Sequence, residues 1–237
     1  MASYRIMTYN IRHGEGLDGQ LDPDRIAAVI RREQADLVAL MDVDGGTDGV
    51  GGGDELAELA AATGLDGIFC QSIAYRNGSY GNAILSRFPV RAQARYALPG
   101  RERRSVLAAD LELPVGGSLR FATTHLDLDE ESRLESAPVL QAFLDGLPRL
   151  PTILGGDFND PPGSAVVHAF ARAGWHLASG DRFSPTYPAQ APETRIDYLL
   201  SRDLPANMSL EQAQVVAEPL ASDHCPLLAV LTVRTEV

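Results

Sequence analysis

Short apolar segments interleaved with polar residues recur along the chain, and their alternation with a period of two is typical of strands. The segments have strand length and are bounded by Gly, Pro, Asn or Asp. Strands are predicted at residues 4–14, 36–44, 68–70, 81–86, 90–98, 105–113, 119–124, 151–159, 195–201 and 227–233.

Four segments carry the spacing of amphipathic helices instead. Helices are predicted from Asp22-Pro23 onward, from Asp54 to Gly64, over 130–147 with a break or restart at Pro138, and over 164–173. Strands both alternate with helices and follow one another as hairpins, which favours mixed sheets. No linker divides the sequence, so we expect one α/β domain over residues 1–237, with two mixed sheets packed face to face and helices outside.

The most informative motif lies in residues 151–162, where an apolar run ends in Gly155-Gly156 and continues to Asp157 and Asn159. Strand alternation would place Asp157 and Asn159 on one face. The glycines allow close packing of the backbone or a phosphate group above it. A carboxylate and an amide at a strand end suit a hydrated divalent cation or a phosphate, although Asp-x-Asn after Gly-Gly is also an ordinary turn composition.

Further polar residues stand at the ends of apolar runs, where open α/β sheets place ligands. Each could be structural on its own, as a turn cap or a surface loop residue. Asp197 is costly inside an apolar strand unless it is paired, and His224 is its expected partner. Oxygen ligands without thiolates favour Mg²⁺ or Mn²⁺ over Zn²⁺. The set is Asn10, Asp42, His125, Asp157, Asn159, Asp197, Asp223 and His224, with Asp44 two residues after Asp42.

Charge narrows the classes of partner. The formal net charge of −12 disfavours non-specific binding to duplex DNA, although bound cations would still permit a phosphate substrate. The densest positive charge lies in residues 99–104, which form either an exposed loop or a contact to a substrate phosphate. No apolar stretch approaches the roughly 20 residues that span a membrane, and no signal peptide is visible. Cys70 and Cys225 are expected to be buried free thiols in a reducing cytoplasm.

Seven motifs in this order resemble the endonuclease/exonuclease/phosphatase superfamily. That group includes deoxyribonuclease I, apurinic endonucleases, neutral sphingomyelinases and inositol-polyphosphate 5-phosphatases. The resemblance implies a four-layer α/β sandwich and Mg²⁺- or Mn²⁺-dependent cleavage of a phosphoester by water. The motifs are Thr8–Arg12, Leu37–Asp44, Gly81–Ser86, Thr124–Asp127, Gly156–Asn159, Arg195–Tyr198 and Ser222–His224.

The resemblance also implies roles for the polar residues. Asn10 and Asp42 would hold the metal, with Asp223 near it, directly or through water. Asp157 would orient or deprotonate the attacking water, or protonate the leaving oxygen. His125 and Asn159 would donate hydrogen bonds to phosphoryl oxygens. His224, oriented by Asp197, would stabilise charge on the phosphoryl group or activate the water.

One departure from the family pattern concerns the metal. Met41-Asp42 stands where the family usually has Gln-Glu, and that Glu is its principal metal ligand. An Asp carboxylate falls short by about 1.5 Å, one C–C bond. The metal would have to shift, a water would have to bridge the gap, or the affinity would drop. Asp44 matches a family position that is not assigned to the metal.

We therefore expect a cytoplasmic Mg²⁺-dependent phosphodiesterase or phosphatase that acts on a phosphorylated small molecule or a lipid headgroup. The alternatives are a DNA-repair nuclease of the apurinic-endonuclease type, and a catalytically weakened relative that binds a phosphorylated ligand. Arg76, Asn82 and Arg104 are candidate substrate contacts. Specificity should lie in the loops at 45–53, 76–80, 99–104 and 185–193. The substrate, the number of metals and the oligomeric state stay open.

Overall fold

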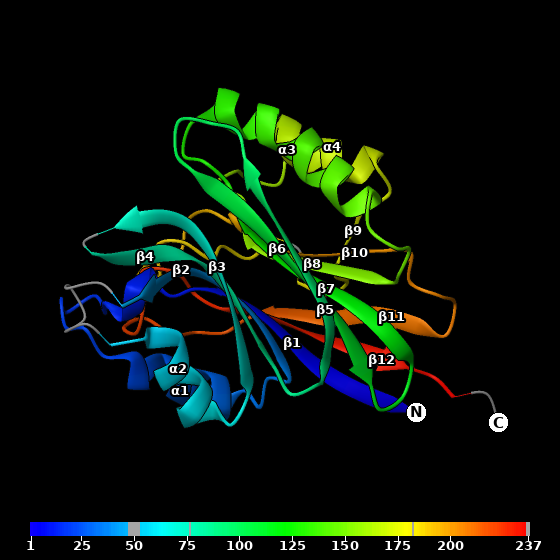
Figure 1. Ribbon diagram of the computed structural model, residues 1–237, viewed down its shortest axis with the longest axis horizontal. Helices are drawn as coiled ribbons and strands as arrows, with labels where there is room; N and C mark the ends of the chain where they lie inside the picture. The colour runs from blue at the N-terminus through cyan, green and yellow to red at the C-terminus, as the bar shows by residue number, and fades with distance from the viewer. Residues whose placement is uncertain (47–52, 76, 182, 236–237) are drawn as a thin grey trace.

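The computed structural model describes residues 1–46, 53–75, 77–181 and 183–235, and within them it contains two six-stranded sheets (Figure 1). The first sheet has the strand order β11-β12-β1-β2-β4-β3. Its strands are β1 (Ala2–Asn10), β2 (Leu37–Gly45), β3 (Asp66–Tyr75), β4 (Gly78–Ser86), β11 (Met208–Val215) and β12 (Leu227–Val233).

The second sheet has the order β5-β6-β7-β8-β10-β9. Its strands are β5 (Val90–Leu98), β6 (Arg104–Leu113), β7 (Gly117–His125), β8 (Thr152–Asp157), β9 (His176–Leu177) and β10 (Asp197–Arg202). Each sheet contains one parallel pair, β1 with β2 and β7 with β8, among antiparallel neighbours. The expectation of mixed sheets is therefore confirmed.

Helices cover the outer face of each sheet, and the apolar alternation explains why (Figure 1). In β1, Ile6 faces the other sheet, whereas Met7 and Tyr9 pack with α1 (Pro23–Arg32) and α2 (Glu55–Thr63). The helices α3 (Glu130–Asp145) and α4 (Ala165–Arg172) cover the second sheet in the same way. The result is the expected four-layer α/β sandwich.

The two parallel pairs determine where polar side chains meet. Parallel strands need a crossover, which is supplied by α1 between β1 and β2 and by α3 between β7 and β8. The carboxyl ends of paired strands are then adjacent: Asn10 lies beside Met41, and His125 lies beside Asp157. Both sheets therefore end in polar residues at one edge of the sandwich.

The glycines of residues 155–156 serve close packing. A Cβ on Gly155 would lie 2.8 Å from the Cβ of Ala39 in the other sheet, and a Cβ on Gly156 would lie 2.4 Å from the carbonyl oxygen of Thr124. The sheets thus approach each other closely just before β8 delivers Asp157, which confirms the packing role expected for these glycines.

Helix boundaries agree with the sequence except at two points. Asp54 and Ser164 cap their helices with side-chain bonds, but Asp22 makes no such bond. The break expected at Pro138 is wrong, because α3 continues through this residue. Pro138 occupies the middle of a sixteen-residue helix that is packed on the second sheet, so packing outweighs the missing backbone donor. No helix among the described residues is long and apolar enough to cross a membrane.

Candidate active site

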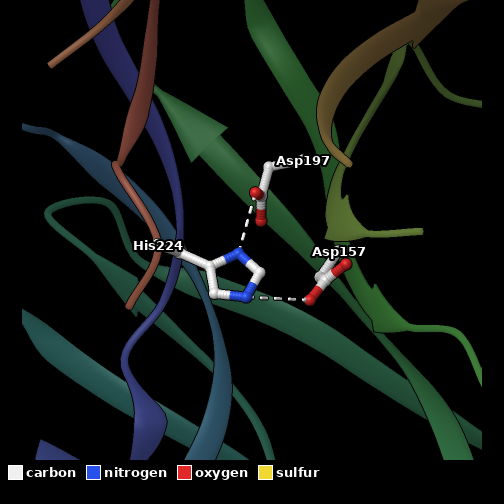
Figure 2. A group of neighbouring side chains, drawn as sticks. All are labelled: Asp157, Asp197 and His224. Carbon is white, nitrogen blue, oxygen red and sulfur yellow. Dashed lines mark hydrogen bonds and ion pairs between the residues drawn. The ribbon is translucent and has the colours of Figure 1, made fainter. Parts of the chain in front are cut away.

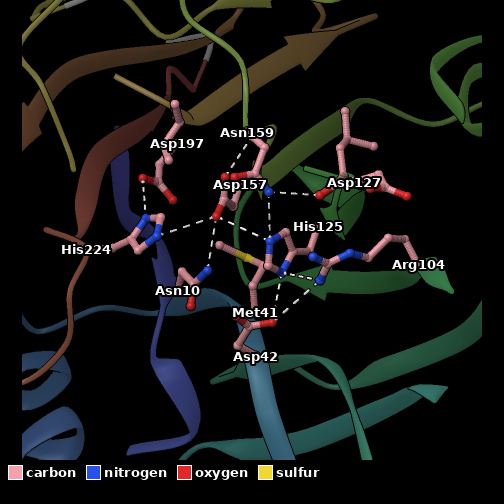
Figure 3. A network of polar contacts seen from close by, with 12 residues as sticks. Asn10, Met41, Asp42, Arg104, His125, Asp127, Asp157, Asn159, Asp197 and His224 are labelled. Carbon is pink, nitrogen blue, oxygen red and sulfur yellow. Dashed lines mark hydrogen bonds and ion pairs between the residues drawn. The ribbon is translucent and has the colours of Figure 1, made fainter. Parts of the chain in front are cut away.

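Polar side chains from both sheets meet at the shared edge and form one connected network (Figure 3). Asp157, at the end of β8, is the centre of this network. Its Oδ2 accepts a hydrogen bond from Asn10 Nδ2 at 3.0 Å, and its Oδ1 accepts one from the backbone N–H of Asn159 at 2.9 Å. Burial, opposed by the neighbouring His125, raises the pKa of the Asp157 carboxyl above its ordinary value. Asp157 is therefore suited to take up a proton.

Two histidines approach the same oxygen of Asp157. The Nε2 atoms of His125 and His224 lie 3.4 Å and 3.6 Å from Asp157 Oδ2. Each imidazole has its Nδ1 directed at another carboxylate 2.9 Å away, Asp42 for His125 and Asp197 for His224. The site thus contains two carboxylate–histidine dyads that face one acid.

The Asp197–His224 dyad is the one that the sequence predicted (Figure 2). Asp197 is 1% exposed at the start of β10, and its backbone N–H donates to Thr186 Oγ1 at 3.3 Å. Burial alone would lower the pKa of His224, but the Asp197 carboxylate outweighs it and raises this pKa to about 10. One ligand atom from each of Asp157, Asp197 and His224 lies within 4.8 Å of the others, a spacing that suits a cation only with His224 in its neutral form.

The Asp42–His125 dyad was not expected. Strand alternation should have placed Asp42 and Asp44 on one face, but a bulge shifts the β2–β4 register between Leu40 and Val43. Asp42 has φ of 58°, a left-handed conformation that Asp tolerates better than most residues. The bulge interrupts the alternation, and the Asp42 carboxylate lies against His125 of the second sheet.

Arg104 and Tyr80 complete the surroundings of Asp42. Arg104 Nη1 lies 3.0 Å from His125 Nδ1 and 3.7 Å from Asp42 Oδ1. The Tyr80 hydroxyl is close enough to the same carboxylate to stabilise its charged form. Burial alone would raise the pKa of Asp42, but His125 and Arg104 together with Tyr80 hold it well below its usual range. Asp42 is therefore an anion whose charge is balanced within the protein.

Asn159 reaches the site by a turn rather than by strand alternation. β8 ends at Asp157, and Asn159 has φ of 50°, so the expectation of one regular strand face is wrong. The turn brings Asn159 Nδ2 to 2.9 Å from the carbonyl of Leu126 and 3.1 Å from His125 Nε2. The turn therefore holds the Asn159 amide against the imidazole of His125.

The residues expected to hold a metal lie on adjacent segments. The hydroxyl of Ser222 donates to the Asn10 carbonyl at 2.7 Å, which places the segment of Asp223 beside β1. Asn10 Oδ1 accepts from the backbone N–H of Arg12 at 3.1 Å, and Asp223 has a partly exposed carboxylate 3.9 Å from the Arg12 guanidinium. The group offers only oxygen donors, which is the chemistry that a hard divalent cation requires.

The three candidate substrate residues differ in where they lie relative to the network. Arg104 belongs to the network. Asn82 is buried, donates to the carbonyl of Ser105 at 2.9 Å, and lines a cavity beside the network rather than joining it. Arg76 lies outside the described residues.

A buried ion pair behind the network was missed. Arg133 of α3 donates to the carbonyls of Asp127 at 3.1 Å and Leu128 at 2.7 Å, and it lies 3.2 Å from Asp160. One guanidinium thus joins the segment after β7 to the turn after β8. In the sequence Arg133 is one charge in an acidic helix, so no local signal distinguishes it.

Glu55, the first residue of α2, was also missed. Its Oε2 accepts a hydrogen bond from the backbone N–H of Asp44 at 2.7 Å, and its Oε1 has no hydrogen-bond partner within the part of the chain that the structure describes. Burial raises the pKa of this carboxyl to about 8. Glu55 thereby fixes the end of β2 directly after the bulge that carries Asp42.

Comparison with known proteins agrees with this architecture. An uncharacterized protein of Escherichia coli K12, YbhP, is 27% identical over 96% of this chain and 95% of its own length. The crystal structure of an endonuclease/exonuclease/phosphatase from Beutenbergia cavernae superposes with a TM-score of 0.81 at 25% identity, covering 98% of this chain and 72% of that one. A mannosyl-6-phosphatase of Bacteroides thetaiotaomicron shares the fold, with a TM-score of 0.75 at 19% identity over 97% of this chain and 99% of that one. The model of the Endonuclease/Exonuclease/phosphatase family matches residues 7–224, and the chain therefore belongs to this family of hydrolases acting on phosphoesters.

Proposed function

We propose that the protein, as a single domain over residues 1–237, is a Mg²⁺-dependent phosphoesterase that hydrolyses a phosphorylated small molecule or a lipid headgroup. The observation that carries this proposal is the convergence of two carboxylate-oriented histidines on Asp157 at the edge where both sheets end. The mannosyl-6-phosphatase with the same fold is a relative that acts on a small phosphate ester. Mn²⁺ is the alternative ion.

The proton chemistry follows from the contacts of Asp157. The Asn10 amide and the backbone of Asn159 hold this carboxylate, so it orients the attacking water and accepts its proton. Asp197 stabilises the positive form of His224, which suits that imidazole to balance charge on the phosphoryl oxygens.

His125 and Asn159 form the other wall of the phosphate site. They donate hydrogen bonds to the phosphoryl oxygens once substrate replaces their contact with each other, which for His125 requires a proton on Nε2. Because Asp42 fixes the ring of His125, this donor is in position before substrate arrives.

Asn10, Asp42 and Asp223 are the oxygen donors that would hold Mg²⁺. When bound, the ion supplies Lewis-acid stabilisation of charge on the phosphoester. Asp42 is shared in this arrangement, since its Oδ1 also faces Arg104 and His125. Two buried free cysteines, Cys70 and Cys225, suit a reducing compartment, and we place the protein in the cytoplasm.

A panel of phosphomonoesters and phosphodiesters, assayed with Mg²⁺, with Mn²⁺ and with EDTA, tests this proposal. We expect hydrolysis of at least one class of ester that EDTA abolishes and added Mg²⁺ restores. Efficient incision of abasic-site duplex DNA at physiological salt would favour a repair nuclease instead. Failure to bind Mg²⁺ at millimolar concentration in calorimetry, together with no turnover, would indicate a phospho-ligand-binding relative.

A further inference from the structure

A cavity of about 570 Å³ opens beside Asp42 of the Asp42–His125 dyad, and neither His125 nor Asp157 lines it. Asp42 and Tyr80 border it toward the network, and the loop between β5 and β6 borders it on the other side. Its volume is in the range of sites for small molecules, about 300–1,000 Å³. The roles proposed above for catalysis leave this space unused.

The charge of the loop is opposite to that of the molecule. The chain carries a net charge of −12, yet Arg101, Arg103 and Arg104 all line the cavity within four consecutive residues. The one acid among them, Glu102, lies 2.6 Å from Arg104 Nη2. The loop therefore presents a local positive charge to a cavity that adjoins the network at Asp42.

The three arginines differ in what they already bind. Arg104 is 12% exposed and is committed to Glu102 and the Asp42–His125 dyad. Arg101 is paired at the rim with Asp129 at 3.0 Å. Arg103 is exposed and makes no hydrogen bond or ion pair with any residue that the structure describes. Arg103 is thus the arginine with all its donors available for a ligand.

The backbone on the N-terminal side of Arg103 is fixed by hydrogen bonds to Asp127 and Ser132. Glu102 N–H donates to Asp127 Oδ2 at 2.8 Å, and Arg101 N–H donates to Ser132 Oγ at 3.1 Å. Gly100 has φ of 140°, and a Cβ there would lie 2.8 Å from Asp127 Oδ2. Because Asp127 follows His125 by two residues, the loop is tied to the catalytic edge, and little backbone entropy is lost when Arg103 binds a ligand.

We propose that this cavity binds a second phosphate group of the substrate, with Arg103 as its principal contact and Arg101 beside it. Guanidinium groups pair with phosphate through parallel hydrogen bonds. The substrate class is then a bisphosphate of a polyol or sugar, free or as a lipid headgroup. Its scissile phosphate lies at Asp157, and Arg104 lies between the two anions. This assignment rests on the proposed phosphoesterase function.

Calorimetry without metal, where no turnover occurs, tests the cavity separately from the activity. The ligands are glucose 6-phosphate and glucose 1,6-bisphosphate, and the proteins are wild type, Arg103→Gln and the matched control Arg91→Gln. Arg91 is 66% exposed and lies outside the cavity, with its Nε 4.0 Å from the Glu112 carboxylate. Thermal unfolding confirms that the variants are folded.

We expect the wild type and Arg91→Gln to bind the bisphosphate more tightly than the monophosphate by at least about tenfold, the scale of one charge-assisted hydrogen bond. Arg103→Gln should lose most of that preference. A parallel arm uses vesicles of phosphatidylcholine with and without phosphatidylinositol 4-phosphate. An Arg103-dependent preference for the phosphorylated vesicles alone assigns the second phosphate to a lipid headgroup.

Equal binding of the mono- and bisphosphate by the wild type, with no vesicle preference, would overturn the second-phosphate site. So would a preference that Arg103→Gln retains in full. Absence of phosphoester hydrolysis in the panel, with the Arg103-dependent preference present, would overturn the proposed function and leave an anion-binding cavity.

Discussion

His224 and His125 contact Asp157 in matching ways, but their surroundings differ. His224 is held by Asp197, which is 1% exposed and closed off from solvent. His125 is held by Asp42, whose side chain is 19% exposed and borders the arginine-lined cavity. The carboxylate of the Asp197–His224 dyad is closed off from solvent, and we call this pair the sealed dyad. The carboxylate of the Asp42–His125 dyad borders the cavity, and we call this pair the open dyad.

The two carboxylates also differ in how many groups share their charge. Asp197 has His224 as its side-chain partner, so the charge of that dyad is set by the fold. Asp42 is shared among His125, Arg104 and Tyr80, so a cation or phosphate that enters can redistribute these contacts. We infer that the sealed dyad handles transition-state charge, and that the open dyad couples the catalytic acid to the metal and the cavity.

Removing the acid that both dyads face should have the largest effect. We expect Asp157→Ala to lower kcat/KM by at least about 10²-fold, and His224→Ala to do the same, since each loses a main acid–base or electrostatic group. His125→Ala should lose less, because Asn159 remains to contact the phosphate. Steady-state kinetics on an ester from the panel measure this, with the exposed His168→Ala on α4 as control. A near-normal rate for Asp157→Ala or His224→Ala would contradict the assignment.

The support of the open dyad can be tested with two buried arginines, Arg133 of α3 and Arg120 of β7, the strand that α3 follows in the chain. Arg133 holds the segment after His125, whereas Arg120 of β7 binds Asp110 at 2.7 Å and the carbonyl of Pro148, away from the site. Lys keeps the charge but loses the planar fork. We expect both Arg→Lys variants to lower the melting temperature, and only Arg133→Lys to lower kcat, by about tenfold, because small displacements of catalytic groups are costly.

The melting temperatures show whether the two substitutions perturb folding equally, so the rates can be compared well below unfolding. If Arg120→Lys lowered kcat as much as Arg133→Lys, the loss would reflect general destabilisation rather than positioning of the catalytic edge.

Local patterns were enough to predict the sealed dyad and the layers. Asp197 interrupts an apolar strand, and burying an unpaired acid is so unfavourable that a partner such as His224 had to exist. The alternation of β1 likewise fixes which residues face each layer. These features depend on period and polarity, which a sequence displays directly.

The open dyad could not be predicted, because its geometry departs from the period-two alternation that made the other features predictable. The bulge at Asp42 and the turn at Asn159 both use positive φ and depart from strand alternation, and no Gly marks either position. The Arg133–Asp160 pair joins α3 to the turn after β8 and leaves no periodic trace. The helix break at Pro138 was predicted wrongly because the lost backbone hydrogen bond is a local effect that the sequence displays. The packing of α3 on the second sheet, which offsets this loss, depends on residues far away in the sequence.

The smallest expected effect concerns the metal donor of the open dyad. Asp42→Glu adds about 1.5 Å of reach, one C–C bond, and restores the residue that the family usually carries here. We expect the affinity for Mg²⁺ or Mn²⁺ to rise or stay level in calorimetry, with the gain limited because Glu is less suited than Asp to φ of 58°. Asp42→Asn keeps the length, loses the charge and should bind the ion more weakly. If the metal affinity of Asp42→Glu fell as far as that of Asp42→Asn, the metal site would depend on the shorter Asp side chain. The bulge that places Asp42 against His125 would then determine the geometry of the metal site.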